Sequence, residues 1–362
     1  MTLDVRLNNQ SLRQLLEAPP KINDQLESAC RVLDLEVRTA TSLVNYMGQP
    51  VELWYNNARW FFGFLFRRGT ESGGKVTYSV FDPLYYSKKT PDDYYLKNVT
   101  ATQGFKQIAD RVGIVTGALA NTGVVFPALY YDGSAPDKVF IDLLARTYQA
   151  NGKKYWYRFD PSVDNFGLTL FERVIPPQVW AFQVGVNLTA ARYEESIEEA
   201  ATVVKLVNRD TGKVVTKVAN EALKQFGHMI HFEEVDKDQA ATMEKKAQEL
   251  LTKLARVTTS ASIEGINPDR KIPQLYSGDV IYVEESVTKL IGAYHIRNLT
   301  QTFESDNLVT IAADIQGAPD VPEIQYEDAV KKPEASAKAG KGVQENTQYN
   351  DATKAVLDKY GL

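Results

Sequence analysis

Several residue types are scarce in this chain of 362 residues, and each scarcity argues against a class of protein. A single cysteine, Cys30, excludes an intrachain disulfide. No apolar run approaches the roughly 18 residues of a membrane-spanning helix, and the first ten residues lack the cationic start and apolar core of a signal peptide. The net charge of −5 argues against a nucleic-acid-binding face, which needs a basic patch. We therefore expect two or three globular domains and no membrane insertion.

Histidine is also scarce, which limits the metal sites that the chain can form. His228 and His231 are three apart, a spacing that places them on opposite faces of a strand, and no cysteine or third histidine lies nearby in the sequence. His295 and Cys30 each lie within an apolar strand pattern and are predicted to be core residues. We expect no metal and no cofactor.

Two further patterns suggest chemistry but are better explained by structure. The segment 69–75 has the glycine and lysine spacing of a phosphate-binding loop, but Val76 stands where that loop needs Ser or Thr. It also joins two predicted strands, so we expect a hairpin turn. The carboxylates of Glu194, Glu195, Glu198 and Glu199 form a charge run that we interpret as solvated and not as a catalytic pair. We predict no catalytic residues.

The most informative stretch is 48–82, which predicts an antiparallel meander. Val51, Leu53 and Tyr55 alternate with Glu52 and Trp54. Asn56-Asn57 is typical of a turn, and 60–66 is a second strand that contains Gly63. A glycine inside a strand marks a bulge, a bend or a close backbone approach. Val76, Tyr78 and Val80 begin a third strand. The pattern favours a small barrel or sandwich.

The same order recurs at 278–314, which predicts an internal duplication. Strand 280–283 corresponds to 51–55, the glycine-containing strand around Gly292 corresponds to the strand around Gly63, and 309–311 corresponds to 76–78. Each copy ends on an aspartate, Asp82 or Asp314. A period this long indicates duplicated domains and not a solenoid.

The remaining elements give four predicted regions. Residues 1–97 form a first barrel, with strands at 3–7 and 25–37, the latter bulged near Val32-Leu33, and a short helix at 11–17. Residues 98–176 form a small α/β insert with helices at 102–112 and 137–150 and a hairpin at 155–172. Residues 177–318 form a second barrel with a hairpin at 201–219 and a long helix at 236–257. Residues 319–362 have linker composition followed by a short helix.

The last thirteen residues, 350–362, recover a helical pattern. Ala352, Val356 and Tyr360 recur at i, i+4 and i+8, which places them on one face of a helix. A short amphipathic helix beyond a linker cannot bury this stripe alone. We therefore predict a frayed tail or a peptide that docks in a partner's groove, with these three residues as its contacts.

The ordered series of segments 50–82, 98–113, 196–208 and 277–314 resembles the baseplate hub, or tail-tube-cap, family of contractile injection systems. Within that family it is most similar to the hubs of PBSX-like defective prophages, and it is also similar to the hub of T-even phages, the late control protein and the type VI spike. The resemblance implies a mainly β chain with two tail-tube-like antiparallel barrels, a small α/β domain between them and a flexible C-terminal tail.

The resemblance also implies a structural role without enzymatic activity. Three chains with two barrels each would form a pseudo-hexameric ring that joins the hexameric tail tube to the trimeric central spike. The implied partners are a tail tube or tube-initiator protein above, the spike below, and a baseplate or lysin protein on the C-terminal tail. A tape-measure protein or DNA would pass an acidic lumen. Assembly is expected in the bacterial cytoplasm, and the final location is the baseplate of a phage or phage-tail-like particle.

Two other functions compete with the hub. A tail-associated cell-wall hydrolase would need a carboxylate pair or metal cluster in one cleft, and activity on peptidoglycan would reveal it. A glycan-binding β protein would be a stable monomer with an exposed aromatic groove. We found no sequence motif for either.

Overall fold

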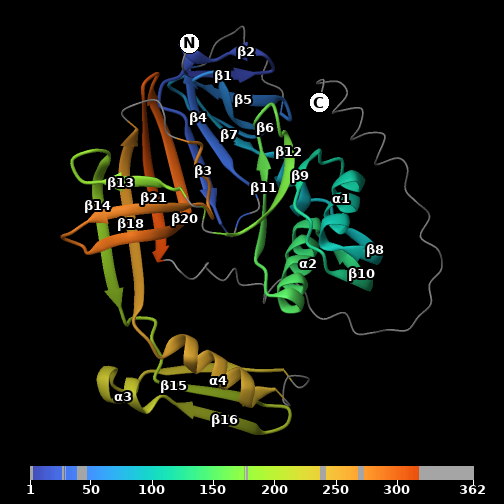
Figure 1. Ribbon diagram of the computed structural model, residues 1–362, viewed down its shortest axis with the longest axis vertical. Coiled ribbons are helices and arrows are strands. Elements are labelled where there is room, and N and C mark those ends of the chain that lie inside the picture. Colours follow the sequence, from blue (N-terminus) through green and yellow to red (C-terminus); the bar gives the residue numbers. More distant parts are fainter. Residues whose placement is uncertain are drawn as a thin grey trace. The chain divides into compact units, whose positions relative to one another are not determined.

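The computed structural model describes residues 3–26, 28, 30–38, 47–174, 176, 178–236, 242–267 and 273–317. The residue contacts divide the chain into two compact units (Figure 1). Unit 1 comprises Met1–Ala191 and Ile263–Leu362, and unit 2 comprises Arg192–Ser262. The described residues are mainly β with few helices, which confirms the predicted class. No helix among them is long and apolar enough to cross a membrane.

The first meander of unit 1 forms as predicted. It consists of β5 (Pro50–Tyr55), β6 (Ala58–Thr70) and β7 (Lys75–Phe81), and neighbouring strands are antiparallel. Asn56 and Asn57 both have positive φ, 50° and 64°, as a two-residue hairpin turn requires. Inward and outward positions alternate strictly along β5 and β7 because one face of each strand packs on the core.

The N-terminal region differs from the sequence prediction in two places. The predicted single strand at 25–37 is wrong, because the chain reverses between β3 (Lys21–Gln25) and β4 (Val32–Arg38), which pair antiparallel. The reversal, and not a bulge, lets apolar residues of both parities face the core. The predicted helix at 11–17 is a shorter 3-10 turn, η1 (Arg13–Leu15). Two more strands precede it, β1 (Leu3–Leu7) and β2 (Gln10–Ser11).

The second meander consists of β19 (Val280–Glu285), β20 (Leu290–Ser305) and β21 (Leu308–Gly317), also antiparallel. The long strand β20 is shared. Along one edge it pairs with β21, and along the other it pairs with β19 and then with β3. Strand β13 (Trp180–Gln183) adds to β19 in parallel. The pairing of β20 with β3 joins the two meanders into a single sheet.

Two further strands, β14 (Leu188–Ser196) and β18 (Thr258–Asn267), extend this sheet. It follows one path of hydrogen-bonded neighbours, β14-β18-β21-β20-β3-β4-β7-β6-β5-β1-β2, with β19 and β13 branching from β20. Among the described strands the path does not return on itself, so the ladder does not close the two predicted barrels. A side chain links distant parts of the path, because Leu3 N donates to Asp306 Oδ1 (3.1 Å) at the β20–β21 turn. Phe303 of β20 also packs edge-on against Tyr55 and Trp60 of the first meander.

The predicted α/β insert packs on the first meander. Helix α1 (Ala101–Val112) begins with a capping box at Thr100 and ends at Gly113 in the left-handed conformation, as predicted. Phe105 of α1 stacks on Phe140 of α2, and their core includes Phe62 and Phe64 of β6. The other elements are η2 (Pro83–Lys88), β8 (Asp92–Thr100), β9 (Thr116–Leu119), β10 (Val125–Ser134), α2 (Pro136–Asn151), β11 (Tyr155–Asp160) and β12 (Gly167–Glu172).

Unit 2 is a three-stranded sheet with one helix on it. Strands β15 (Val203–Asn208) and β16 (Lys213–Val218) form the predicted hairpin, and β17 (Ile230–Glu234) pairs with β15 in parallel. Helix α4 (Met243–Leu254) lies along one face (Figure 1). The predicted helix at 236–257 is too long, because Asp236 is not helical and the helix ends where Ala255 leaves helical geometry. The remaining elements are α3 (Asn220–Phe226), β14 (Leu188–Ser196) and β18 (Thr258–Asn267), the last two of which cross the boundary between the units.

The predicted C-terminal helix, with Ala352, Val356 and Tyr360, lies outside the described residues. The predicted boundaries at residues 97, 176 and 318 stay a prediction.

Candidate functional site

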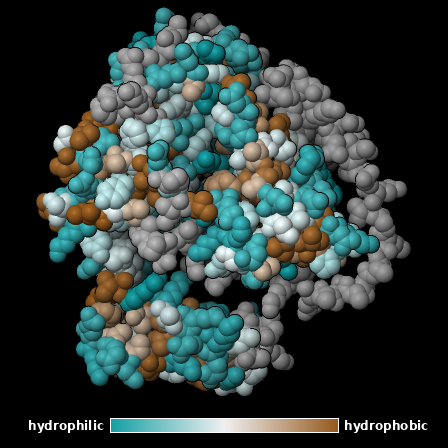
Figure 2. Space-filling model, viewed as in Figure 1, coloured by the Kyte–Doolittle hydropathy of each residue, from teal (hydrophilic) through white to brown (hydrophobic). Residues whose placement is uncertain are grey.

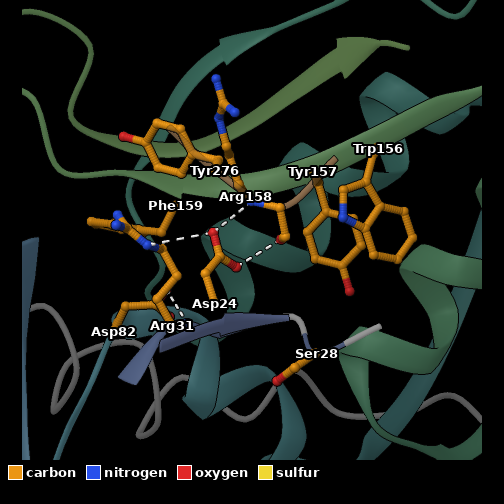
Figure 3. Close-up of a pocket in the computed structure, with 10 residues that line it drawn as sticks. Asp24, Ser28, Arg31, Asp82, Trp156, Tyr157, Arg158, Phe159 and Tyr276 are labelled. Atoms are coloured by element: carbon orange, nitrogen blue, oxygen red, sulfur yellow. Dashed lines mark hydrogen bonds and ion pairs between the residues drawn. The ribbon is translucent and has the colours of Figure 1, made fainter. Parts of the chain in front are cut away.

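A group of polar side chains in unit 1 surrounds a small cavity where distant segments of the chain meet (Figure 3). The cavity of about 10 Å³ has room for one water molecule at most. A substrate or cofactor does not fit in it. We call the side chains Asp24, Arg31, Asp82, Arg158, Tyr276 and Asp279 the polar junction.

Asp24 and Arg31 form the centre of the polar junction. They come from β3 and from the residue before β4, and the β3–β4 reversal brings them together. Arg31 Nε lies 3.7 Å from Asp24 Oδ2, and both side chains are almost completely buried. Asp24 also accepts two hydrogen bonds from Ser277, from its backbone N at 3.0 Å and from its Oγ at 2.7 Å. One carboxylate therefore ties the N-terminal strands to the segment before β19.

Asp82 terminates the first meander and caps the next turn. Its two carboxyl oxygens accept hydrogen bonds from Arg31 N at 2.8 Å and from Leu84 N at 3.0 Å. Burial raises the pKa of the Asp82 carboxyl to about 7, although the hydrogen bond from Arg31 N and the Arg31 charge oppose the shift. Asp82 is thus a buried acid that changes charge near neutral pH.

Tyr276 lies between two guanidinium groups. The Cζ of Arg158 is 3.9 Å from the ring centroid and that of Arg31 is 4.6 Å away. Arg158, on β11 of the insert, donates from Nη1 to Asp279 Oδ1 at 3.0 Å, and Asp279 accepts the backbone N of Tyr276 at 3.0 Å. Burial raises the pKa of Tyr276 and of Asp279. This arrangement joins the insert to the start of the second meander by cation–π contact and charge.

The polar junction has the chemistry of a structural connector. Asp24 and Asp82 each accept a hydrogen bond from a backbone N–H group of a distant segment, and Asp279 accepts one from Tyr276 N and one from the Arg158 side chain. The oxygens of these carboxylates are therefore engaged in holding the chain. Cys30 next to them is buried, and burial raises the pKa of its thiol to about 12, which keeps it protonated at neutral pH. We assign the polar junction to the positioning of the two meanders and the insert relative to one another.

A second arginine holds the insert to the first meander. Arg59, at the start of β6, donates to Glu52 Oε1 at 2.8 Å and to the carbonyl O of Pro161 at 2.6 Å. Its guanidinium lies over the rings of Phe166 and Phe62 at 4.6 and 5.4 Å. The insert therefore contacts each meander through one stacked, charge-paired arginine, Arg59 or Arg158.

The residues that the sequence singled out lie apart from the polar junction, except Asp82, which belongs to it, and Cys30, which lies beside it. The 71–74 segment is the β6–β7 hairpin turn, as predicted, with Gly74 N donating to Glu71 O. His295 is buried in β20, as predicted for a core residue, and burial lowers its pKa. His231 lies on β17 with Nε2 3.5 Å from Glu233, whereas His228 precedes that strand. Within the described residues, no three His, Cys, Asp or Glu side chains are placed to hold a metal.

The acidic run lies on and just after β14. Glu194 and Glu195 are exposed on the strand, and Tyr193 OH donates to Glu195 Oε1 at 2.9 Å. Glu198 and Glu199 follow in a turn and are exposed. The run is solvated, as predicted.

Sequence reasoning missed most of the polar junction. Its members are separated by up to about 250 residues, and no local spacing relates them. The available signals were Asp82 at the end of a meander and Arg31 in an otherwise apolar segment. A charged residue is rarely buried within an apolar pattern unless it is paired. The charge of Arg31 between apolar neighbours could therefore have identified it as a buried, paired residue.

The chain is similar to a known protein family and to individual proteins of bacterial origin. The model of the YQBQ-like family matches residues 21–311. Two proteins of Bacillus subtilis (strain 168) are similar in sequence. The uncharacterized protein YqbQ is 27% identical over 241 residues, which cover 65% of this chain and 71% of YqbQ. The phage-like element PBSX protein XkdQ is 27% identical over 242 residues, with the same coverage.

Two solved structures share the fold along most of the chain. The 43 kDa tail protein of prophage MuSo2 from Shewanella oneidensis superposes with a TM-score of 0.60, at 16% identity, over 87% of this chain and 97% of that one. The tail protein from Neisseria meningitidis MC58 superposes with a TM-score of 0.56, at 12% identity, over 87% and 96%. This chain therefore shares the fold of these two tail proteins.

Proposed function

This chain belongs to the YQBQ-like family and shares the fold of two tail proteins. From these two premises we propose its role. The role is that of a structural baseplate protein, specifically the hub that joins a hexameric tail tube to a trimeric central spike. The observation that carries the proposal is the pair of antiparallel meanders that one chain contributes to a single sheet. Three copies supply six such meanders, which matches a six-fold ring under three-fold symmetry.

In this proposal the chain is organised as two tail-tube-like barrels, 1–97 and 177–318, with the insert 98–176 between them and a tail at 319–362. The Leu3–Asp306 hydrogen bond and the packing of Phe303 on Tyr55 and Trp60 hold the β20–β21 hairpin of the second half against the first meander. The polar junction and Arg59 hold the insert against both halves. Unit 1 would then present the ring contacts from one rigid body.

The second meander has an exposed apolar end that suits a contact between subunits or with the tube. Val184 follows β13. Val287 lies in the β19–β20 turn and Ile291 lies just after that turn, and they are 86% and 56% exposed, respectively. Register places Gln183, Glu284 and Ile291 in one row across β13, β19 and β20. Figure 2 shows hydrophobic residues at the edge of unit 1 where Figure 1 places these turns. We call Val184, Val186, Tyr282, Val287 and Ile291 the apolar end of the second meander.

The proposed partners are a tube or tube-initiator protein on one side and the spike on the other, with a tape-measure protein or DNA passing through the lumen. The segment with Ala352, Val356 and Tyr360 would dock on the spike, a lysin or a neighbouring baseplate protein. Deletion of residues 344–362 should leave the trimer intact and lose one partner in pull-downs. Unchanged partner recovery would contradict this docking role.

We infer a role without catalysis, because the carboxylates of the polar junction are engaged by backbone N–H groups around a cavity of about 10 Å³. The assay is a zymogram of the purified chain on peptidoglycan, in which a cleared band would establish a hydrolase instead.

Native mass spectrometry of the full chain, alone and co-expressed with the spike protein, tests the hub. A trimer in either condition supports it, and a monomer in both at concentrations well above micromolar contradicts it. The double substitution Val287→Glu and Ile291→Glu should abolish the trimer or its binding to the tube protein, since charge at a buried contact must be desolvated. Val163→Glu, at a valine of the insert that is 66% exposed, is the control.

A further inference from the structure

Both faces of the sheet of unit 2 carry large apolar side chains, but α4 covers only one of them. Val204, Leu206 and Val215 face α4 and are buried with Ala247 and Leu251. The residues between them in sequence point to the other side, because successive side chains of a strand alternate between faces. We call this second side the open face.

Strand register assembles the open face from three rows. Val203 of β15 lies between Val218 and Ile230, Lys205 lies between Thr216 and Phe232, and Val207 lies between Val214 and Glu234. The four large apolar side chains of the outer strands are between 43% and 55% exposed: Val214, Val218, Ile230 and Phe232.

A sheet face with this many apolar side chains is rarely left exposed to solvent. All-parallel sheets occur almost only where both faces are covered, and this mixed sheet contains one parallel pair, β15 with β17. The sequence of β15, VVKLVN, is nearly continuous in apolar residues, which is the pattern of a strand buried on both faces. An antiparallel hairpin with one wet face would show polar residues at these positions instead.

The size of the open face limits what can cover it. Three strands about 4.8 Å apart and about six residues long span roughly 14 by 20 Å, or about 300 Å². A stable dimer buries about 800 Å² on each partner, so two copies of the open face would not hold a dimer by themselves. One helix is about 10 Å wide, and on the other face the 12 residues of α4 suffice. The area therefore fits one amphipathic helix of similar length.

Charge further defines the occupant. On the covered face, ion pairs connect the sheet to α4: Lys217 with Glu244 at 2.8 Å, and Glu233 with Lys246 at 2.7 Å. On the open face, Glu234 is already paired with Arg209 at 2.8 Å. Lys205, in the central row, has no ion pair with any residue that the structure describes. A helix that covers the open face would need a carboxylate opposite Lys205.

We propose that the open face of unit 2 binds one amphipathic helix of a different baseplate protein, with an apolar stripe interrupted by a single Asp or Glu that pairs with Lys205. The bound helix completes a three-layer α/β/α arrangement in which α4 and the partner helix cover opposite faces of β16-β15-β17. The identity of the partner as a baseplate protein rests on the proposed function. The apolar rows and Lys205 of the open face would select which helix binds.

The test is site-specific photo-crosslinking in assembled tail particles, with a benzoylphenylalanine in place of Phe232 and, as the control, in place of exposed Val163. The expected result is a crosslink from position 232 to a helical segment of another particle protein that carries an acidic residue in an apolar stripe. A crosslink to a second copy of this chain, or none from position 232 in particles that contain the chain, would overturn the proposal. Absence of the chain from particles would instead contradict the baseplate role.

Charge reversal gives an independent readout. Lys205→Glu in the full chain should weaken the crosslinked partner's binding about tenfold, and Glu→Lys at the partner's acidic position should restore it. Native mass and far-UV circular dichroism should stay unchanged, since Lys205 is exposed. Equal binding by wild type and K205E would contradict the assigned pairing.

Discussion

The first and second meanders are alike in strand order and antiparallel pairing, and each has a glycine in its middle strand, but the position of the glycine and the surroundings differ. Gly63 lies opposite Val51 in the first, and Gly292 lies opposite Val283 in the second. The insert covers the Phe62 and Phe64 face of the first, and Trp54 at its hairpin lies within 5.4 Å of the Arg6 guanidinium. The hairpin end of the second exposes Val287 and Ile291. A repeated pattern therefore specifies strands, and the neighbours of each copy decide which surfaces remain for binding.

The two glycines provide the sharpest test of this difference. A Cβ on Gly63 would lie 2.4 Å from the carbonyl O of Phe81, whereas a Cβ on Gly292 meets no atom within 4 Å but must be carried at φ +144°. Gly63→Ala should lower the free energy of unfolding by about 3 kcal/mol, because backbone must move. Gly292→Ala should lower it by about 1 kcal/mol through backbone strain alone. Urea denaturation of both variants measures this, and equal losses would show that the glycines serve one purpose.

The aspartates that end the meanders should differ in their response to pH. Asp82 is buried with a pKa near 7, whereas Asp314 is exposed and accepts from Asn298 at 2.8 Å. Between about pH 4 and 7 the folded state keeps a proton on Asp82 that the unfolded chain has released, so the free energy of unfolding falls as pH rises through this window.

Asp82→Asn should therefore reduce the loss of stability between pH 4.5 and 7.5 by about 2 kcal/mol. His295, whose pKa is lowered by burial, acts in the opposite direction below its ordinary pKa, but equally in both proteins. The measurement is chemical denaturation at the two pH values, with Asp314→Asn as the control. The same pH dependence in wild type and D82N would refute the assignment.

The two arginines that connect the insert should contribute unequally. The Arg59 side chain is 10% exposed and that of Arg158 is 29% exposed. Arg59→Met should cost about 2 kcal/mol and Arg158→Met about 1 kcal/mol, since solvent screens the more exposed pair. Amide hydrogen exchange should report faster opening of the insert in R59M, and of 276–280 in R158M. A double-mutant cycle of R158M with Asp279→Asn should show coupling, and additive losses would exclude their interaction.

Glycine substitutions in the turns of the two meanders should give the smallest difference in stability. Lys289 adopts φ +60° in the second hairpin, and Asn57 adopts φ +64° in the first. Lys289→Gly should stabilise the chain by about 0.5 to 1 kcal/mol because lysine is strained there. Asn57→Gly should gain less, since asparagine tolerates this conformation. Thermal melting compares them, and a larger gain at position 57 would reverse the interpretation.

Local physical chemistry in the sequence determined most of the individual elements. Alternation gave β5 and β7, Asn56-Asn57 gave a turn, and a helical stripe ended by Gly113 gave α1. Each depends on residues within a few positions of one another, where side-chain periodicity and backbone preference act directly. The start of α4 is less well determined locally, because the helix begins at Met243 without a side-chain cap, after the predicted start at residue 236.

Only the tertiary structure decided how the elements meet. The pairing of β3 with β20 joins Gln25 to Asn298, and no local pattern encodes that register. The split of 25–37 into two strands depends on which partners β3 and β4 find, since both parities of that segment are apolar. The polar junction requires Asp24, Arg31 and Tyr276 to converge from separate strands and loops. Sequence alone set the strands and turns of this protein, and long-range packing set its junctions and open surfaces, because those depend on partners hundreds of residues away.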